Sequence, residues 1–408
     1  MRRALKLLGL VVGAIVVLVA GFLVYVQIDG IPRYKVEKVT FRADPTPERL
    51  EQGRKLVSRL CAGCHQDPTT RQLTGKHMAD APREFGPIYS PNITRHPTKG
   101  IGSWTDGELA YLIRTGVKRD GQYAPPYMAK LPHISDEDLA SIIVFMRSDD
   151  PMVAASDRDP PGVPQPSLLT KVLCHTVFKP LPYPRQPIAA PAVTDKVAYG
   201  RYLVTGLECY GCHSADFKTM NIADPEKTPG YLGGGNPMLD LRGNTIPTAN
   251  LTPDAETGIG RWSEKDLVTT LRTGFRPDGT LVRYPMVPVP DLSDEEGAAI
   301  YAYLKTVPAI RNPLPKPPVM PAAGTNLDGK ALYEQYGCVS CHGDDGIGIA
   351  DLREAGQHYP TPEALELWIL DAPRVRPGTR MPGWRGVIHG EHLKALMDHV
   401  LALGKTKR

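Results

Sequence analysis

The chain has 408 residues, and its 23% charged and 41% hydrophobic side chains are ordinary for a globular protein of two or three domains. The formal net charge of +4 includes Arg2, Arg3 and Lys6 at the extreme N-terminus, so the rest of the chain is nearly neutral. Nucleic-acid binding therefore has no support in the charge. Proline is frequent, with 41 residues, and much of it is concentrated between the other sequence patterns.

The first element is an uncharged apolar run from Leu7 to Val26. About 20 such residues suffice for one membrane-spanning helix. The basic residues before the run place the N-terminus in the cytoplasm and everything after Asp29 outside, by the positive-inside rule. We expect an uncleaved single-pass anchor over residues 1–29. A cleaved signal peptide is the alternative, although the run does not end in a small-x-small cleavage site.

Three pentapeptides of the form Cys-x-x-Cys-His follow along the chain. They are formed by Cys61, Cys64 and His65, by Cys209, Cys212 and His213, and by Cys338, Cys341 and His342. This spacing is typical of c-type haem attachment, in which both thiols bond the haem and the histidine binds the iron. A zinc site would need four ligands, usually with a second Cys-x-x-Cys nearby. We therefore predict three covalently bound haem c groups. Bacteria attach such haems outside the cytoplasmic membrane, which agrees with an exported chain.

An internal repeat relates the first two haem segments. With constant spacing, each segment contains Gly-Ile-Gly-x-Trp (100–104 and 258–262), Arg-Thr-Gly (114–116 and 272–274) and one methionine (128 and 286), all preceded by Asn-x-Thr (92–94 and 250–252). The second copy carries an insertion before its tryptophan, which we place at the glycine-rich residues 230–235. The third segment lacks the tryptophan block. It shares with the others a glycine eight or nine residues before the first cysteine, at 53, 200 and 329.

Sequence signals for helices occur at the beginning and near the end of each unit. Thr46 followed by Pro47 predicts a helix start, and Ser135-x-x-Asp138 and Ser293-x-x-Glu296 resemble capping boxes before apolar helical runs. Residues 391–403 are the corresponding helix of the third unit. Alternating strand patterns are missing. We predict an all-α fold of three tandem cytochrome c domains with long loops, preceded by one transmembrane helix.

The domain boundaries follow the proline distribution. We place the cytochrome c domains at 47–150, 192–310 and 323–408, joined by semi-rigid proline-rich linkers at 151–191 and 311–322. The first two domains are expected to form a packed pair, with the third at one end. Cys174 lies in the first linker beside His175 but has Lys171 where an attachment motif needs cysteine. We therefore expect a free thiol and not a fourth haem site.

Each haem usually needs a sixth ligand, and methionine opposite histidine raises the reduction potential. The repeat nominates Met128 and Met286, and the loop bounded by Pro377 and Pro382 nominates Met381. Competing candidates are His77, Met78, His133 and Met238. Each methionine has the alternative of filling a core.

Two further residue pairs have open roles. Arg114 and Arg272 could bind haem propionates through their guanidinium forks or could lie on solvated helix faces. Trp104 and Trp262 are expected to pack against haem or core, or to donate to a propionate.

These residues give the chain a resemblance to a known family. From 47 to 405 it resembles the triheme cytochrome c subunits of bacterial membrane-associated dehydrogenases of the alcohol and gluconate type. The resemblance rests on the three Cys-x-x-Cys-His motifs, the two Asn-x-Thr segments and both Gly-Ile-Gly-x-Trp blocks. The third unit looks like a class I cytochrome c domain. The resemblance implies a subunit that passes electrons from a catalytic partner towards quinone or a terminal oxidase. Family members typically have a cleaved signal and a C-terminal membrane association, from which this chain departs.

We therefore expect an electron-transfer protein and not an enzyme: a periplasmic triheme cytochrome, anchored in the bacterial cytoplasmic membrane, that relays electrons between a dehydrogenase and the respiratory chain. The expected partners are a periplasmic or membrane dehydrogenase subunit and the quinone pool or a terminal oxidase. The alternative is a peroxidase-like haem enzyme, which needs one open iron position. A haem-based sensor is disfavoured by the short stretch before the apolar run.

Overall fold

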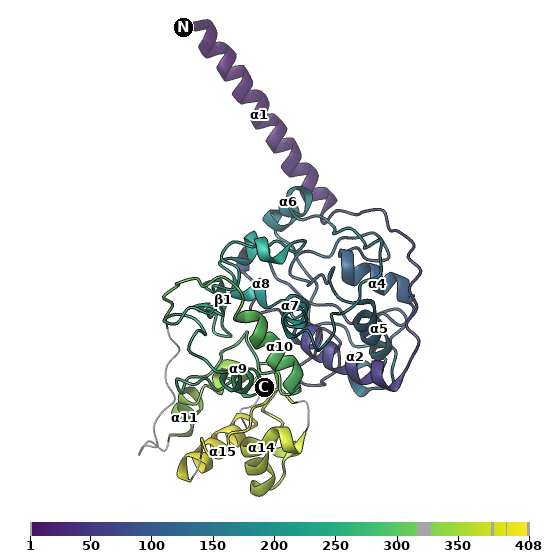
Figure 1. Ribbon diagram of the computed structural model, residues 1–408. Helices are drawn as coiled ribbons and strands as arrows, with labels where there is room; N and C mark the ends of the chain where they lie inside the picture. Colours follow the sequence, from purple (N-terminus) through teal and green to yellow (C-terminus); the bar gives the residue numbers. More distant parts are fainter. Residues whose placement is uncertain (1, 316–327, 377–378, 389, 406–408) are drawn as a thin grey trace.

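The computed structural model describes residues 2–315, 328–376, 379–388 and 390–405. Helix α1 (Arg2–Asp29) projects from the body as an isolated rod, and the other elements form one mass at its end (Figure 1). Among the described residues, its segment Arg3–Asp29 alone is long and apolar enough to cross a membrane, with a mean hydropathy of 3.0. The sequence prediction of one N-terminal helix of this kind is confirmed by length and composition.

The body is mostly helical, as predicted. The first unit contains α2 (Pro47–Leu60), α3 (Ala62–His65), α4 (Asp106–Thr115) and α5 (Asp136–Met146), and α6 (Leu168–Thr176) follows it. The second contains α7 (Lys196–Gly206), α8 (Cys209–His213), α9 (Glu264–Thr273) and α10 (Asp294–Leu304). The third contains α11 (Gly329–Gln335), α12 (Val339–His342), α13 (Ala355–His358), α14 (Pro362–Val375) and α15 (Glu391–Leu403).

The structure adds two short strands, β1 (Pro237–Leu239) and β2 (Thr245–Pro247), to the predicted all-α fold. They pair antiparallel, with Met238 opposite Ile246. Gly243 in the connecting turn has a φ of +80°, a conformation that glycine adopts at little cost. Three residues per strand are too few to leave an alternating pattern, and the sequence therefore gives no sign of the hairpin.

Within each unit the first helix crosses the last at a glycine. A Cβ on Gly53 of α2 would lie 1.9 Å from the Ser141 carbonyl oxygen of α5, and one on Gly200 of α7 would lie 1.9 Å from that of Ala299 in α10. A Cβ on Gly329 of α11 would lie 2.2 Å from the Ala395 oxygen of α15. The repeated glycine therefore serves the same close helix crossing in all three units.

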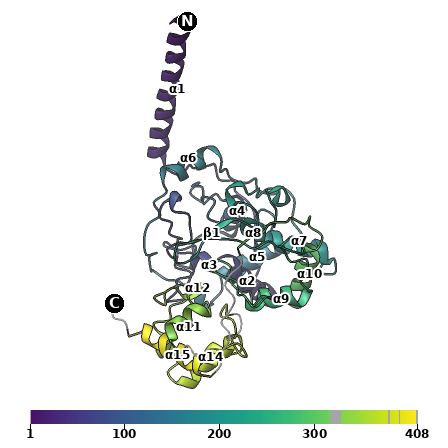
Figure 2. The same cartoon turned by 90° about the vertical axis from the view of Figure 1, so that its left-hand side faces the viewer.

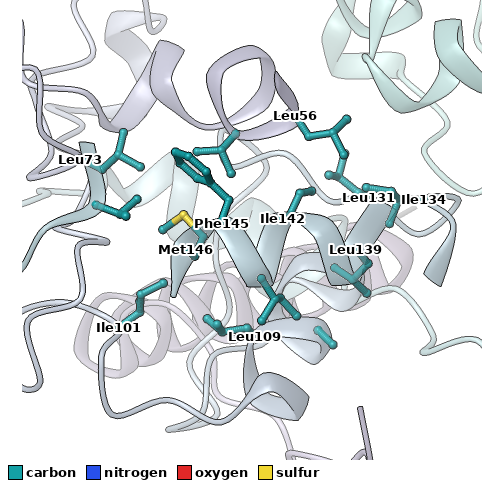
Figure 3. Packing of buried hydrophobic residues seen from close by; sticks show 14 of the residues in the cluster. Leu56, Leu73, Ile101, Leu109, Leu131, Ile134, Leu139, Ile142, Phe145 and Met146 are labelled. Atoms are coloured by element: carbon teal, nitrogen blue, oxygen red, sulfur yellow. The ribbon is translucent and has the colours of Figure 1, made fainter. Parts of the chain in front are cut away.

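Each crossing is surrounded by its own hydrophobic core. In the first unit, residues such as Leu56, Leu139, Ile142 and Phe145 are nearly inaccessible to solvent and interdigitate between the helices (Figure 3). The second core includes Leu203 and Tyr303. The third core includes Leu332, Tyr336, Trp384, Leu393 and Leu396. Three separate cores agree with three structural units.

Local capping explains where these helices begin. Thr46 Oγ1 accepts from the Arg49 amide at the start of α2, as predicted. Ser293 and Glu296 form the predicted reciprocal capping box of α10. The predicted box at Ser135 is only half formed. Its serine accepts from the Asp138 amide, but the Asp138 carboxylate is bonded by Gln52 and by the Tyr202 hydroxyl of the second unit.

The first two units pack against each other, as expected. Arg59 of α2 bonds Glu296 at 2.9 Å and Asp291 at 3.2 Å, and its side chain is only 6% exposed. In the opposite direction, the Tyr202 hydroxyl of α7 lies 3.0 Å from Ser135 at the start of α5. Charged groups buried at this boundary satisfy one another, so removing one partner would leave the other unpaired.

The third unit contacts both of the others. Phe275 of the second unit packs edge-on against Trp384, with ring centroids 5.4 Å apart, and Arg242 bonds Asp344. On the side of the first unit, Thr69 Oγ1 lies 3.4 Å from Asp351. Figure 2 shows the yellow helices α14 and α15 at the end of the molecule opposite α1. The third unit is therefore packed onto the pair and is not suspended from a linker.

The first linker departs from the expected extended spacer. Residues 168–176 form α6, capped by Ser167, whose hydroxyl accepts from the Thr170 amide. Two hydrogen bonds attach other parts of the linker to the first unit. The Gln165 amide of the linker donates to the Pro87 carbonyl, and the Ile188 carbonyl of the linker accepts from the Asp136 amide. Proline density correctly marks a segment without its own core, but the proline-free stretch within it is long enough for a helix. Residues 316–322 of the second linker, position 323 and Pro377 lie outside the described residues.

Candidate haem sites

Each Cys-x-x-Cys-His motif occupies one short helical turn directly after the first helix of its unit. The turns are α3, α8 and α12, which follow α2, α7 and α11. Successive turns of a helix bring residues three and four apart onto one face. The two cysteines and the histidine of each motif therefore share one side of a turn whose position is fixed by the glycine crossing behind it.

All three motif histidines use Nδ1 to contact a backbone carbonyl. The distances are 2.9 Å from His65 to Pro91, 2.8 Å from His213 to Ala249, and 3.3 Å from His342 to Ala350. A carbonyl can only accept, so Nδ1 carries the proton and Nε2 keeps its lone pair. Burial also lowers the pKa of each of the three imidazoles, which favours the neutral form. Neutral imidazole with an oriented Nδ1–H is the state that binds iron through Nε2.

The Asn-x-Thr repeat is the turn that presents these carbonyls. Asn92 Oδ1 accepts from the Thr94 amide at 2.9 Å and from its hydroxyl at 2.7 Å, and Asn250 and Thr252 repeat both distances. Pro91 and Ala249 stand immediately before these asparagines. Residues that looked like a family signature in the sequence are therefore positioning residues for the histidines.

The cysteines sit where a charged sulfur would be unfavourable. Burial raises the pKa of Cys61, Cys209 and Cys338 to about 12. A thioether bond to haem carries no charge, so the environment of these sulfurs fits covalent haem attachment.

A single cavity of about 1530 Å³ joins the first two motifs. It is larger than the roughly 300–1,000 Å³ that usually holds one small-molecule ligand. The two predicted methionines, Met128 and Met286, both line it, together with the cysteine pairs and histidines of both units. Thr248 also lines it, and its buried hydroxyl lacks a hydrogen-bond partner among the described residues. The cavity, its sulfur and imidazole groups and this hydroxyl fit two haems.

The competing ligands separate into two groups. Met78 and Met238 line the same cavity, and so does Met220, which the sequence analysis missed as a candidate. His133 instead uses Nε2 to contact the Ile222 carbonyl at 2.9 Å, and His77 is exposed beside the ring of Tyr89. Met128 and Met286 therefore line the cavity together with Met78, Met220 and Met238.

Met220 was missed because of where the insertion lies. The Ile93 amide bonds Leu73 in the first unit, and the Leu251 amide makes the same bond with Leu232 in the second. Residues 230–235 are therefore aligned with the first unit, and the extra residues precede them, between His213 and Leu232. Met220 belongs to this insertion, and its sulfur would lie 3.0 Å from a Cβ on Gly211.

In the third unit, Cys338 and Met381 pack against the same hydrophobic core. Trp384 in that core is 4% exposed, and its indole N–H lacks an acceptor among the described residues. A buried donor without a partner suits a site completed by a group with acceptor oxygens, such as a haem carboxylate. The residues present fit a third haem.

The repeated arginines and tryptophans make equivalent contacts in the first two units. Arg114 bonds the Ile134 carbonyl and Asp136, and Arg272 bonds the equivalent Leu292 carbonyl at 2.7 Å and Asp294 at 2.7 Å. Both guanidinium groups therefore bind the start of the last helix of their own unit. Trp104 and Trp262 pack against the first and second cores, and Trp262 also lines the cavity.

Two ionisable residues that the sequence gave no reason to select also line the cavity. Burial lowers the pKa of Lys130 to about 7 and raises that of Glu208 to about 7. Lys130 Nζ bonds the Pro125 carbonyl at 2.7 Å. Cys174 is fully buried as a free thiol, which agrees with the sequence expectation.

Comparison with known proteins agrees with this geometry. Residues 48–146 and 324–400 match the family described as cytochrome C oxidase, cbb3-type, subunit III. The chain is 30% identical over 352 residues to the gluconate 2-dehydrogenase cytochrome c subunit of Pantoea cypripedii, covering 80% of this chain and 76% of that protein. It is 31% identical over 261 residues to a diheme cytochrome c-type protein of Cereibacter sphaeroides, covering 61% and 82%.

A third relative is named for another dehydrogenase. The cytochrome c subunit of the quinone-dependent alcohol dehydrogenase of Gluconacetobacter polyoxogenes is 30% identical over 322 residues, covering 74% of this chain. The chain spans 66% of the length of that protein. Together, the three motif turns, their oriented histidines and these relatives show that the chain belongs to the family of c-type cytochromes whose members include the cytochrome c subunits of alcohol, fructose and gluconate dehydrogenases.

Proposed function

We propose that this chain is a membrane-anchored triheme cytochrome that relays electrons between a periplasmic or membrane dehydrogenase and the quinone pool or a terminal oxidase. The observation that carries the proposal is the threefold occurrence of one arrangement: a Cys-x-x-Cys-His turn behind a glycine crossing, with the histidine held by a carbonyl at Nδ1. Bound haem would supply one-electron chemistry at each turn.

The chain's own residues have distinct tasks in this proposal. The cysteine pairs would hold three haems covalently, and His65, His213 and His342 would each offer Nε2 to one iron. Met128, Met286 and Met381 are proposed as the opposite ligands, supported by the cavity for the first two and by the shared core for the third. Methionine opposite histidine keeps potentials high, which suits accepting electrons from a dehydrogenase.

Close packing supports exchange between the sites. One cavity serves the first two motifs, and Arg380 of the third unit lines that cavity too. A Cβ on Gly63 in the first attachment turn would lie 3.9 Å from Arg380 Nη1. The third unit thus reaches the first attachment turn directly.

Helix α1 supports the proposed location. Its side chains from Leu7 to Leu18 are at least half exposed, which a chain in water would not tolerate over such a length. With basic residues at its start, it would place the body in the periplasm. N-terminal sequencing of the mature protein tests this, because a start after Gly21 would indicate a cleaved signal peptide.

Two measurements test the relay. Mass spectrometry of the denatured mature protein should show three haem additions, and a smaller number would contradict the triheme assignment. Addition of substrate to a mixture with its dehydrogenase should reduce all three haems, and membranes carrying oxidase should reoxidise them. Turnover of peroxide by the protein alone at enzymatic rates would favour the haem-enzyme alternative instead.

A further inference from the structure

Helix α6 joins the anchor helix to the body. Lys171 Nζ lies 3.0 Å from Gln27 Oε1, and His175 Nε2 lies 3.1 Å from the Gly30 carbonyl and 3.4 Å from Asp29 Oδ2. The ring of Tyr25 meets His175 edge-on at 5.6 Å between centroids. Both views show α6 at the base of α1 (Figures 1 and 2). The position of α6 relative to α1 is therefore fixed by polar and aromatic contacts.

The end of the apolar surface on α1 indicates at which level of a membrane α6 would lie. Ile28 is 81% exposed and is followed by Asp29, the first acidic residue of the chain. A hydrocarbon core of about 30 Å takes about 20 helical residues, so a span that begins after Lys6 ends near Tyr25. Tyrosine is enriched at this level of a membrane protein, where the headgroups begin. Because α6 contacts Tyr25 and residues 27–30, it lies at the same level.

The outward face of α6 is apolar. Leu168 and Leu169 are 40% and 45% exposed, and Val177 at its C-terminal end is 62% exposed. Lys171 and Lys179 flank this face, and their ammonium groups donate to Gln27 and to the His175 carbonyl at the level of the end of α1. A short helix with exposed aliphatic residues, basic flanks and a position at the bilayer surface has the properties of an interfacial helix.

The inward face of α6 borders the cavity of the first unit. Thr170 and Phe178 line the cavity, and the Tyr123 hydroxyl bonds the Lys179 carbonyl at 3.4 Å. Tyr123 belongs to the segment that leads to Met128. Val177 is both exposed and cavity-lining, so the cavity reaches the surface beside α6.

We propose that α6 lies in the headgroup layer of the outer leaflet, with Leu168, Leu169 and Val177 against lipid, and that the Met128 side of the first haem site is the part of the body next to the membrane. This inference rests on the proposed membrane anchor. A redox partner within the bilayer would then meet the first site, and the third unit, at the far end in Figure 1, would face the periplasm. The surface around α14 and α15 would remain accessible to a soluble dehydrogenase.

Membrane depth is directly measurable in the full-length protein. Single spin labels are placed at Leu169→Cys, Val16→Cys and Leu367→Cys in a Cys174→Ala background, and the protein is reconstituted in vesicles of neutral and anionic phospholipid. Leu367 is the matched control, because it is 42% exposed on α14, at the opposite end. Collision rates with oxygen and with a water-soluble nickel complex are measured with the haems reduced, since low-spin ferrous iron is diamagnetic.

The label at 169 should lose accessibility to nickel and gain accessibility to oxygen relative to 367, with 16 deeper still. If 169 matches 367 while 16 is in lipid, the inference fails and the anchor stands. If 16 is also in water, the anchor itself fails. Nickel exclusion at 169 that appears only after the dehydrogenase is added would identify this face as a protein-docking surface and overturn the inference.

A second variant tests the cause. Leu168→Glu with Leu169→Glu should return a label at Val177→Cys to the aqueous phase, because two buried carboxylates are costly in the interface. Leu367→Glu, which adds a carboxylate at the opposite end of the body, is the control and should leave that label unchanged. An unchanged label in the double variant would show that these side chains do not hold α6 against lipid.

Discussion

The sharpest structural test concerns Gly200, where α7 crosses α10. A Cβ at this position would lie 1.9 Å from the Ala299 carbonyl oxygen and 2.8 Å from the Tyr303 Cβ. Carbon atoms make favourable contacts at about 3.5–4.0 Å, so the two helices must separate by more than about 1 Å. The obstacle is backbone, which has no rotamer to change. Overpacking costs about 1–3 kcal/mol, and the helix preference of alanine returns about 0.5–1 kcal/mol. We expect Gly200→Ala to lose about 1–2 kcal/mol.

Gly206 in the same helix supplies the control. A Cβ there meets nothing within 4 Å, so Gly206→Ala should leave stability unchanged or raise it by up to about 1 kcal/mol. Guanidinium unfolding of the haem-loaded proteins, followed by far-ultraviolet circular dichroism, compares the two variants. A Gly200→Ala protein as stable as Gly206→Ala would refute the reasoning about the crossing.

Three further predictions concern the sites. Burial raises the pKa of Glu208 from 4.5 to about 7, so the protonated carboxyl favours folding, and stability is lost as pH rises from about 4.5 to 7. Glu208→Gln should therefore be about as stable as the parent at pH 4 and more stable by up to about 3 kcal/mol at pH 8. An equal difference at both pH values would contradict this. Met286→Ala should convert one haem to high spin with a lowered potential while Met220→Ala and Met238→Ala leave the spectra unchanged; a change with Met220→Ala instead would identify it as the ligand. Asn92→Ala should lower the free energy of unfolding in denaturant by about 1–3 kcal/mol, because it removes the acceptor of the buried Thr94 amide and hydroxyl. The control Asn244→Ala, at an exposed position, should cost little. Equal losses in the two variants would argue against the positioning turn.

Local chemistry made part of the fold predictable. A helix start needs only its own few residues, so Thr46 before α2 and Ser293 before α10 could be recognised in the sequence. The repeat glycines were also visible, but their reason, a carbonyl of a distant helix, was not. Helix α6 was missed because its stability depends on α1 and on the wall of the cavity, and the surrounding prolines dominated the composition.

The sites divide in the same way. Attachment chemistry is encoded in consecutive residues, so the three motifs could be found directly. The histidine partners could not, since every residue carries a backbone carbonyl and the side chains of Pro91, Ala249 and Ala350 take no part in the contact. The contact between Arg114 and Asp136 could not be found either, because the sequence does not show which carboxylate stands next to a guanidinium 22 residues away.

The three units together indicate what a site of this kind requires. The glycine crossing and the carbonyl at histidine Nδ1 occur in all three, whereas among the described residues the Asn-x-Thr turn and the arginine clamp occur in the first two. The common pair of features fixes the attachment turn and the imidazole, which any haem site in this chain needs. The additional turn and clamp accompany the units that share one cavity and a buried ionic boundary at Arg59. In these two units they fix the turn that carries the carbonyl and the start of the last helix, whereas the third unit, which joins the pair through Phe275, Arg242 and Thr69, holds its histidine through the Ala350 carbonyl.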